Sequence, residues 1–327
     1  MRTSIKALFL ALIFLIILAF AGEINLTDIL DNSSTFNSSS PNSSVVYIQN
    51  GVSGAVTIKD PSTNIPLTMN VDYSFASGSG VIISKDGYII TAFHVVGDPQ
   101  TLETSQKLKR MSEGDINYYI EQAAVTEYLA RYNPQLASQL GGNSNIQNNR
   151  DITNLFIQNN LINVNSAKQT IKVKTDSGLS RNLEAQLIDT GNPANDEDVA
   201  LLKVNRDNLQ ALQISSKNPI GAEVSIYGYP GTRDQNSINL ASSAGSVVRE
   251  VRNTKGILYY EANAPASNGY SGGPVLDTNN RILGIVIYSI QSRGFFRSRT
   301  SSNDSLFLSS NYLIGMCKKN NVPVNIS

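Results

Sequence analysis

Three short sequences of this 327-residue chain carry side chains that could together perform nucleophilic acyl transfer. His94 follows an apolar run, Asp198 opens a second one, and Ser271 lies in the glycine-rich sequence Asn-Gly-Tyr-Ser-Gly-Gly-Pro. A serine hydroxyl attacks a carbonyl group when a base takes its proton and a carboxylate orients that base. The chain contains a single histidine, so any imidazole base has to be His94.

Glycines beside Ser271 suit a further requirement of acyl transfer, a pair of backbone donors for the oxyanion. They permit backbone angles that aim the N–H groups of Gly269 and Ser271 at one point. Taken singly, each feature has an ordinary structural explanation: a packed histidine, an aspartate in a turn, a tight glycine loop. Their combination in the order His, Asp, Ser, each at the edge of an expected strand, favours catalysis.

The elements that would position these residues are mainly strands. From residue 45 onward, short β-branched runs alternate with Gly, Asn and Asp turns, which is typical of a sandwich or barrel. Residues 80–84 and 88–91 form a predicted hairpin around Asp86-Gly87. Further strands are expected at residues 170–175, 183–189, 199–204, 223–228, 244–251, 258–261, 273–277 and 282–289.

A segment of different composition, residues 97–167, interrupts the strands after His94. It contains two expected helices, residues 112–132 with a Ser-x-x-Asp start and a proline stop, and residues 151–160. The segment therefore predicts a helical insertion that could act as a lid, a substrate-recruiting surface or an assembly contact, or could be a tolerated surface decoration. A short helix is expected at residues 310–319.

The N-terminus has the pattern of an export signal. Residues 1–6 carry two positive charges, residues 7–21 form an uninterrupted apolar run, and residues 19–21 offer a small-x-small cleavage pattern. Residues 1–21 thus predict a signal peptide or signal anchor. Residues 22–44 predict a flexible Ser/Asn-rich tether, and residues 45–327 a single catalytic domain. We expect an extracytoplasmic protein, either tethered to a membrane by this segment or secreted after its cleavage.

The composition excludes several other classes of protein. Twenty-six basic residues balance twenty-six acidic ones, so bulk attraction to nucleic acid is not expected. The lone cysteine, Cys317, excludes an internal disulfide, and one Cys with one His cannot supply a structural zinc site. We therefore expect neither a metal ion nor another cofactor.

Five sequences in this chain point to one known family. They are Gly-Ser-Gly-Val-Ile-Ile-Ser at 78–84, Asp-Gly-Tyr-Ile-Ile-Thr at 86–91, His-Val-Val at 94–96, Asp-Val-Ala-Leu-Leu-Lys-Val at 198–204 and Gly-Tyr-Ser-Gly-Gly-Pro-Val at 269–275. Together they resemble the trypsin-like serine proteases of the HtrA/Deg branch. The resemblance implies two six-stranded antiparallel β-barrels, chymotrypsin-like, with the active site in the cleft between them.

The resemblance also assigns roles to residues. It implies His94 as general base, Asp198 as its orienting partner, Ser271 as nucleophile, and the N–H groups of Gly269 and Ser271 as the oxyanion hole. Polypeptides would be the substrates. HtrA relatives commonly form homotrimers, although no residue of this sequence identifies a trimer contact.

The sequence departs from the HtrA pattern in three ways. His94 and Asp198 lie 104 residues apart, more than is usual, because of the insertion, whereas the 73 residues from Asp198 to Ser271 are ordinary. Tyr270 precedes the nucleophile, where HtrA proteases usually have Asn. The chain leaves no room for a PDZ domain after its last helix, so peptide gating through such a domain is not expected.

Substrate preference is indicated by few residues. The position six before the nucleophile, which would form the pocket floor, is Pro265, and the expected wall strand contains Ile287, Tyr288 and Ser289. Because no carboxylate lies at the floor, we expect cleavage after a small or medium apolar residue rather than after Arg or Lys.

The sequence therefore predicts a serine endopeptidase that cleaves exported or unfolded proteins, in extracytoplasmic quality control or processing. Residues 269–273 also match the Gly-x-Ser-x-Gly motif of α/β-hydrolases, but that fold places its histidine after the serine, and here it comes before. The remaining alternative is a protease-like chaperone or binding protein without turnover, because Tyr270 and the insertion could leave the oxyanion loop inactive.

Overall fold

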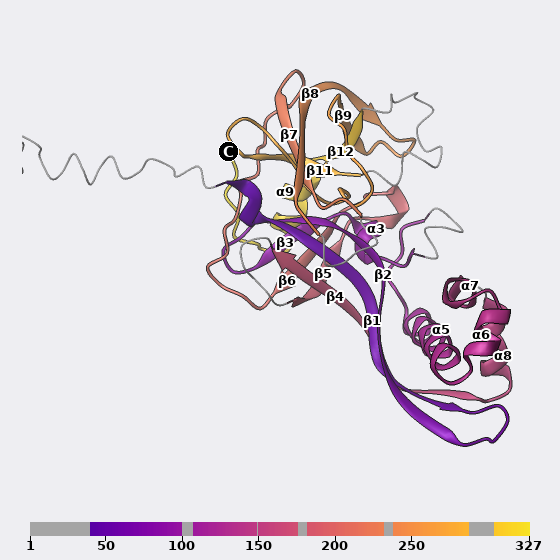
Figure 1. Ribbon diagram of the computed structural model, residues 1–327. Coiled ribbons are helices and arrows are strands. Elements are labelled where there is room, and N and C mark those ends of the chain that lie inside the picture. The colour runs from indigo at the N-terminus through magenta and orange to yellow at the C-terminus, as the bar shows by residue number, and fades with distance from the viewer. Residues whose placement is uncertain (1–39, 100–106, 149, 176–181, 232–237, 288–303) are drawn as a thin grey trace, which may run out of the picture. The chain divides into compact units, whose positions relative to one another are not determined.

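Two closed antiparallel β-barrels form the body of the protein in a computed structural model (Figure 1). The structure describes residues 40–99, 107–148, 150–175, 182–231, 238–287 and 304–327. The strand order is β1-β2-β3-β6-β5-β4 around the first barrel and β10-β11-β12-β9-β8-β7 around the second. The strands of the first barrel are β1 (Val45–Lys59), β2 (Pro66–Ile82), β3 (Tyr88–Thr91), β4 (Ile162–Thr175), β5 (Leu183–Thr190) and β6 (Ala200–Val204). Those of the second are β7 (Glu223–Gly228), β8 (Ala241–Arg252), β9 (Leu258–Ala262), β10 (Pro274–Leu276), β11 (Ile282–Val286) and β12 (Ser305–Ser309). The predicted pair of six-stranded barrels is confirmed.

The hairpin before His94 forms as its sequence predicts. Gly80 pairs with Thr91 and Ile82 with Ile89 across β2 and β3. Gly87 takes a positive φ of 100° at the turn, a conformation that favours glycine. The hairpin ends in a one-turn helix, α3 (Phe93–Val96), that carries His94.

One apolar core connects the two barrels. It includes strand residues of the first barrel, such as Ile90, strand residues of the second, such as Ile285, and Leu313 of the C-terminal helix α9 (Ser310–Lys319). These side chains are fully buried. The shared core fixes the position of one barrel against the other, which a site built from both barrels requires. The helix predicted at residues 310–319 is confirmed.

The insertion is a helical cluster packed on an extension of the first barrel (Figure 1). Its helices are α5 (Glu113–Tyr132), α6 (Pro134–Gln139), α7 (Asn143–Asn148) and α8 (Arg150–Gln158). They cover the outer parts of β1, β2 and β4, with which they share a second core. We call residues 52–59, 66–75, 113–148, 150–158 and 161–167 the arm.

Helix α5 begins where its sequence indicates. The Ser112 side chain accepts a hydrogen bond from the Asp115 N–H, and the Asp115 side chain accepts one from the Ser112 N–H. This reciprocal capping box confirms the predicted helix over residues 112–132. The second predicted helix, residues 151–160, corresponds to α8, which begins at Arg150 and ends two residues earlier, at Gln158.

The structure corrects the boundary between insertion and strand. The sequence suggested a helical segment up to residue 167 and a strand from residue 170, but β4 begins at Ile162 and pairs with β1 from Ile58 onward. Pairing with the long strand β1 overrides the polar, Asn-rich composition that had favoured a loop. Strand β12 and helices α6 and α7 were not predicted either.

The predicted export signal, residues 1–21, lies outside the described residues, as do residues 22–39 of the predicted tether. No helix in the described part of the chain has both the length and the apolar character needed to cross a membrane.

Candidate active site

His94 and Asp198 form a close, largely buried pair. Asp198 Oδ1 accepts a hydrogen bond from the His94 backbone N–H at 2.9 Å, and its Oδ2 lies 2.6 Å from His94 Nδ1. The Asp198 side chain is fully buried, and that of His94 is 8% exposed. One carboxylate thus holds both the backbone and the ring of His94, which leaves Nε2 as the nitrogen that can exchange a proton.

The loop that carries Asp198 is closed by its own hydrogen bonds. The Gly191 N–H donates to the Val199 carbonyl at 2.7 Å, and the Asn192 side chain caps the turn Pro193–Asn195 through the Ala194 N–H. Asp196 then takes a left-handed conformation, with φ of 57°. These contacts reverse the chain just before Asp198, whose buried carboxylate lies two residues before β6.

Three residues of the second barrel also hold this loop, and we call them the clasp. The Tyr259 hydroxyl donates to the Asp196 carbonyl at 2.9 Å, the Asn253 side chain to the Asn195 carbonyl at 3.2 Å, and Lys255 Nζ lies 2.8 Å from Asp196 Oδ2. Burial raises the pKa of Tyr259, so its hydroxyl stays a donor at any physiological pH. The clasp was not predicted from the sequence, because no local pattern marks it.

Ser271 lies in the connection from β9 to β10, which Ser79 of the first barrel holds in place. The Ser79 N–H donates to the Ser271 carbonyl at 2.8 Å, and the Ser79 hydroxyl donates to the Gly269 carbonyl at 2.7 Å. The same hydroxyl accepts the Tyr229 N–H at 2.8 Å. Ser79 belongs to the motif at residues 78–84, but no role was predicted for it from the sequence. The structure makes it the link between strand β2 and the serine loop.

The serine loop packs directly against the residues on both sides of His94. A Cβ atom on Gly272 would lie 2.2 Å from Thr91 Oγ1 and 2.7 Å from the Ala92 N. A Cβ atom on Gly78 would lie 2.6 Å from the Val95 side chain and 2.9 Å from the Ser271 carbonyl oxygen. The loop that carries Ser271 therefore packs against the segment that carries His94, which in turn contacts Asp198.

The backbone around Ser271 leaves two N–H groups uncommitted. Gly269 and Gly272 take positive φ values of 93° and 82°. The N–H groups of Tyr270, Gly272 and Gly273 donate to carbonyl groups of the chain, whereas within the described residues no hydrogen bond uses those of Gly269 and Ser271. The two N–H groups named as the oxyanion hole are thus available to a ligand, as such a hole requires.

Tyr270 points into the second barrel. Its side chain is buried in that barrel's core, and a Cβ atom on Gly228 would lie 2.7 Å from Tyr270 Cγ. Burial raises the pKa of its phenol. The ring therefore helps to anchor the serine loop, and the departure from the HtrA pattern at this position has a packing explanation.

The predicted pocket residues are only partly described. Pro265 is exposed, and its carbonyl accepts a hydrogen bond from the Ser243 hydroxyl. Ile287 is fully buried in the shared core, and its N–H donates to the Leu306 carbonyl at 2.9 Å. Tyr288 and Ser289 lie outside the described residues. The preference for a small or medium apolar residue stays a prediction.

Comparison with known proteins gives one family and a set of similar solved structures. Residues 78–285, more than half of the chain, match the family described as trypsin-like peptidase domain. No curated protein matches the chain. Solved structures similar to this one include two of the Rv3671c protease. The first is the active form from M. tuberculosis, which is 17% identical to this chain over 88% of this chain and 85% of that chain, with a TM-score of 0.46. The second is the inactive form, which is 16% identical over 85% of this chain and 89% of that chain, with a TM-score of 0.45.

Proposed function

Because this chain belongs to the trypsin-like peptidase family, we propose that it is a serine endopeptidase in which Ser271, His94 and Asp198 are the catalytic triad. The observation that carries the proposal is the His94–Asp198 pair beside a serine loop whose backbone is held from both barrels. A family match alone would fit an inactive relative. The retained pair and the two uncommitted N–H groups favour turnover.

The mechanism follows from which atoms are engaged and which are open. Asp198 fixes His94 through Nδ1, so Nε2 takes the proton of the Ser271 hydroxyl as its oxygen attacks the peptide carbonyl. The N–H groups of Gly269 and Ser271 stabilise the oxyanion of the tetrahedral intermediate. His94 then gives the proton to the leaving amine. In the second half of the reaction, water attacks the acyl-enzyme while His94 takes its proton, and His94 returns that proton to the Ser271 oxygen as the acid product leaves.

The finer assignments rest on sequence motifs. We propose that the enzyme is of the HtrA/Deg type and acts outside the cytoplasm on exported or unfolded proteins. The motifs at residues 78–84 and 198–204 and the apolar run at residues 7–21 support this proposal. A fusion of residues 1–44 to a reporter that is active only after export tests the localisation. An inactive reporter would refute export.

The test of the peptidase assignment is covalent labelling with a fluorophosphonate, which reacts with an activated serine. We expect labelling of the wild type and of the matched control Ser267→Ala, which changes an exposed serine of the same loop, and none of Ser271→Ala. Labelling of Ser271→Ala would refute the assignment of Ser271 as the nucleophile. If the folded wild-type protein takes no label but binds an unfolded protein, the peptidase assignment is wrong and the protein is a non-catalytic binding protein.

A further inference from the structure

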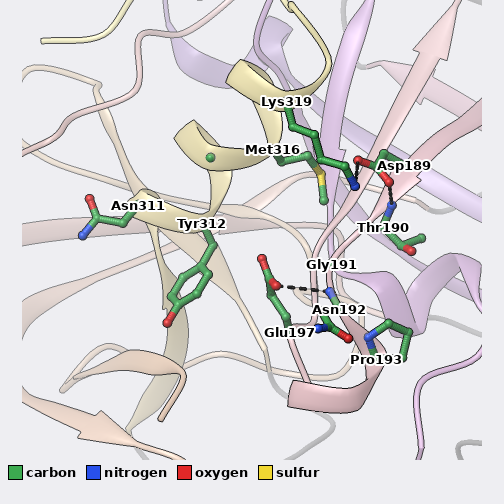
Figure 2. A pocket seen from close by; sticks show the side chains of 11 residues that line it. Asp189, Thr190, Gly191, Asn192, Pro193, Glu197, Asn311, Tyr312, Met316 and Lys319 are labelled. Atoms are coloured by element: carbon green, nitrogen blue, oxygen red, sulfur yellow. Dashed lines mark hydrogen bonds and ion pairs between the residues drawn. The ribbon is translucent and has the colours of Figure 1, made fainter. Parts of the chain in front are cut away.

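A cavity of about 570 Å³ lies between the loop that carries Asp198 and helix α9 (Figure 2). One wall runs from Asp189 to Glu197, the residue directly before Asp198, and the other is formed by α9 from Asn311 to Lys319. None of its lining residues belongs to the proposed triad or oxyanion hole. The cavity is therefore separate from the proposed active site.

The charges in the cavity do not balance. Asp189 Oδ2 lies 2.8 Å from Lys319 Nζ and accepts a hydrogen bond from Asn320. Although burial pushes the pKa of Asp189 upward, these partners outweigh it and hold the pKa below its usual value, so Asp189 is charged and matched by Lys319. Among the charged residues that line the cavity, the carboxylate of Glu197 is then the one without an opposite charge to match it.

Glu197 has one oxygen engaged and one open. Its Oε2 accepts a hydrogen bond from the Asn192 N–H at 3.1 Å, and Figure 2 shows the carboxylate between the Asn192 side and the α9 side of the cavity. Within the described residues no cation pairs with Glu197. A single open oxygen suits an ammonium group, which binds as a point charge, better than a guanidinium, whose planar fork prefers two oxygens.

The α9 wall offers an apolar path to this carboxylate. The Tyr312 ring and the Met316 side chain line it, and Gly315 lies between them in the sequence. A Cβ atom on Gly315 would have no atom within 4 Å. A glycine inside a helix lowers its stability relative to alanine, and here it leaves open space above the helix surface. An alkyl chain about as long as that of lysine could lie there, since such stems pack well on apolar surfaces.

The far end of the cavity can accept a peptide group. Asn311 lines it, and in the described part of the chain its side-chain amide makes no hydrogen bond, so both its donor and its acceptor are open. We propose that this cavity is a binding site for a lysine side chain of a polypeptide, with the ammonium group on Glu197 and the alkyl stem on Tyr312 and Met316.

Methionine methyl groups provide a direct readout of this site. The chain has four methionines, of which Met316 lines the cavity and Met69 and Met111 belong to or adjoin the arm. The full-length Ser271→Ala protein, labelled with ¹³C at the methionine methyl groups, is titrated with N-acetyl-lysine methylamide and followed by NMR. Because no turnover is involved, the result does not depend on the proposed peptidase activity.

We expect a saturable shift of the Met316 methyl signal, with the Met69 and Met111 signals unchanged. The norleucine analogue of the probe, which has the same stem without the ammonium group, should bind at least about tenfold more weakly. Free 1,4-diaminobutane should also bind more weakly, because it lacks the peptide groups. Equal binding of the norleucine analogue, or tighter binding of the diamine, would overturn the assignment to a lysine of a polypeptide.

Two variants complete the test. Glu197→Gln should weaken binding of the lysine probe about tenfold while leaving the fold intact, and Gly315→Leu should abolish binding by filling the open space. Gly114→Leu is the matched control, because Gly114 also lies in a helix and its Cβ would meet only the Ser112 hydroxyl at 3.8 Å. Unchanged binding in Glu197→Gln or in Gly315→Leu would refute the site.

Discussion

At the active site, contacts join distant parts of the chain through buried polar groups, whereas in the arm the helices bury apolar side chains against strands. The Ser79 hydroxyl bonds the Gly269 carbonyl across 190 residues, and His94 meets Asp198 across 104. The arm instead has its own apolar core, which includes Ile120, Leu129 and Phe156. Polar geometry should therefore decide activity at the site, and apolar packing should decide stability in the arm.

The two regions meet at a buried polar junction behind His94. The Asn50 side chain donates to the Gly97 carbonyl at 3.0 Å, and the Gln169 side chain donates both to Asn50 Oδ1 and to the Val96 carbonyl at 2.8 Å. Asn50 and Gln169 lie on β1 and β4, the strands that continue into the arm. At this junction we expect a single change to affect activity and stability together.

The largest effect is expected at the site. His94→Ala removes the only imidazole of the chain, and kcat on an unfolded protein substrate should fall by about 10⁴–10⁶, by analogy with other dissected triads. Activity within tenfold of the wild type would show that another group serves as base.

The reverse behaviour is expected in the arm. Phe156 is 8% exposed and packs edge-on against Tyr128, with ring centroids 6.0 Å apart. Phe156→Ala should destabilise the arm by about 3–5 kcal/mol and leave kcat nearly unchanged. Hydrogen exchange of the α5 and α8 amides measures the loss. Leu155→Ala, at the neighbouring position that is 57% exposed, should cost less than about 0.5 kcal/mol. Equal effects of the two variants would contradict the arm's separate core.

At the junction, Asn50→Ala should affect both properties. The change removes the side-chain donor of the buried Gly97 carbonyl and leaves the Gln169 amide with the Val96 carbonyl as its remaining partner in this junction, which costs about 1–3 kcal/mol. Urea unfolding should show this loss, and kcat should fall because the helix that carries His94 is less well held. Asn163→Ala, on the exposed side of β4, is the control. A loss of stability with full activity would show that the junction does not position His94.

The clasp offers a smaller and more specific effect. Tyr259→Phe keeps the buried ring but removes the hydroxyl that holds the Asp196 carbonyl. We expect kcat to fall about tenfold, which corresponds to a rise of about 1.4 kcal/mol in the activation free energy, and KM to change little. Tyr260→Phe makes the same change one residue along β9, away from the Asp198 loop. If the two variants behave alike, the hydroxyl of Tyr259 has no role in positioning Asp198.

The same contrast explains what could be predicted from the sequence. The triad and the Asp86-Gly87 turn are marked by neighbouring residues, and so is the start of α5 at Ser112. Ser79 and Tyr259 act through partners 190 and 63 residues away, which no local pattern specifies. The outer part of β4 was missed for a similar reason, since its polar, Asn-rich composition makes a strand only when it pairs with β1.

The smallest expected effect tests whether local signals in the arm matter to the site at all. Ser112→Ala removes the side chain that accepts the Asp115 N–H at 3.2 Å and should destabilise α5 by about 1 kcal/mol, whereas Ser112→Thr should retain most of the cap. Urea unfolding measures the loss, and kcat should stay within twofold of the wild type. The Tyr119 hydroxyl of α5 donates to Asp98 at 3.1 Å, two residues beyond α3. A much larger drop in kcat for Ser112→Ala, restored in Ser112→Thr, would therefore mean that the capped end of α5 helps to hold His94, and that the arm and the site are mechanically coupled.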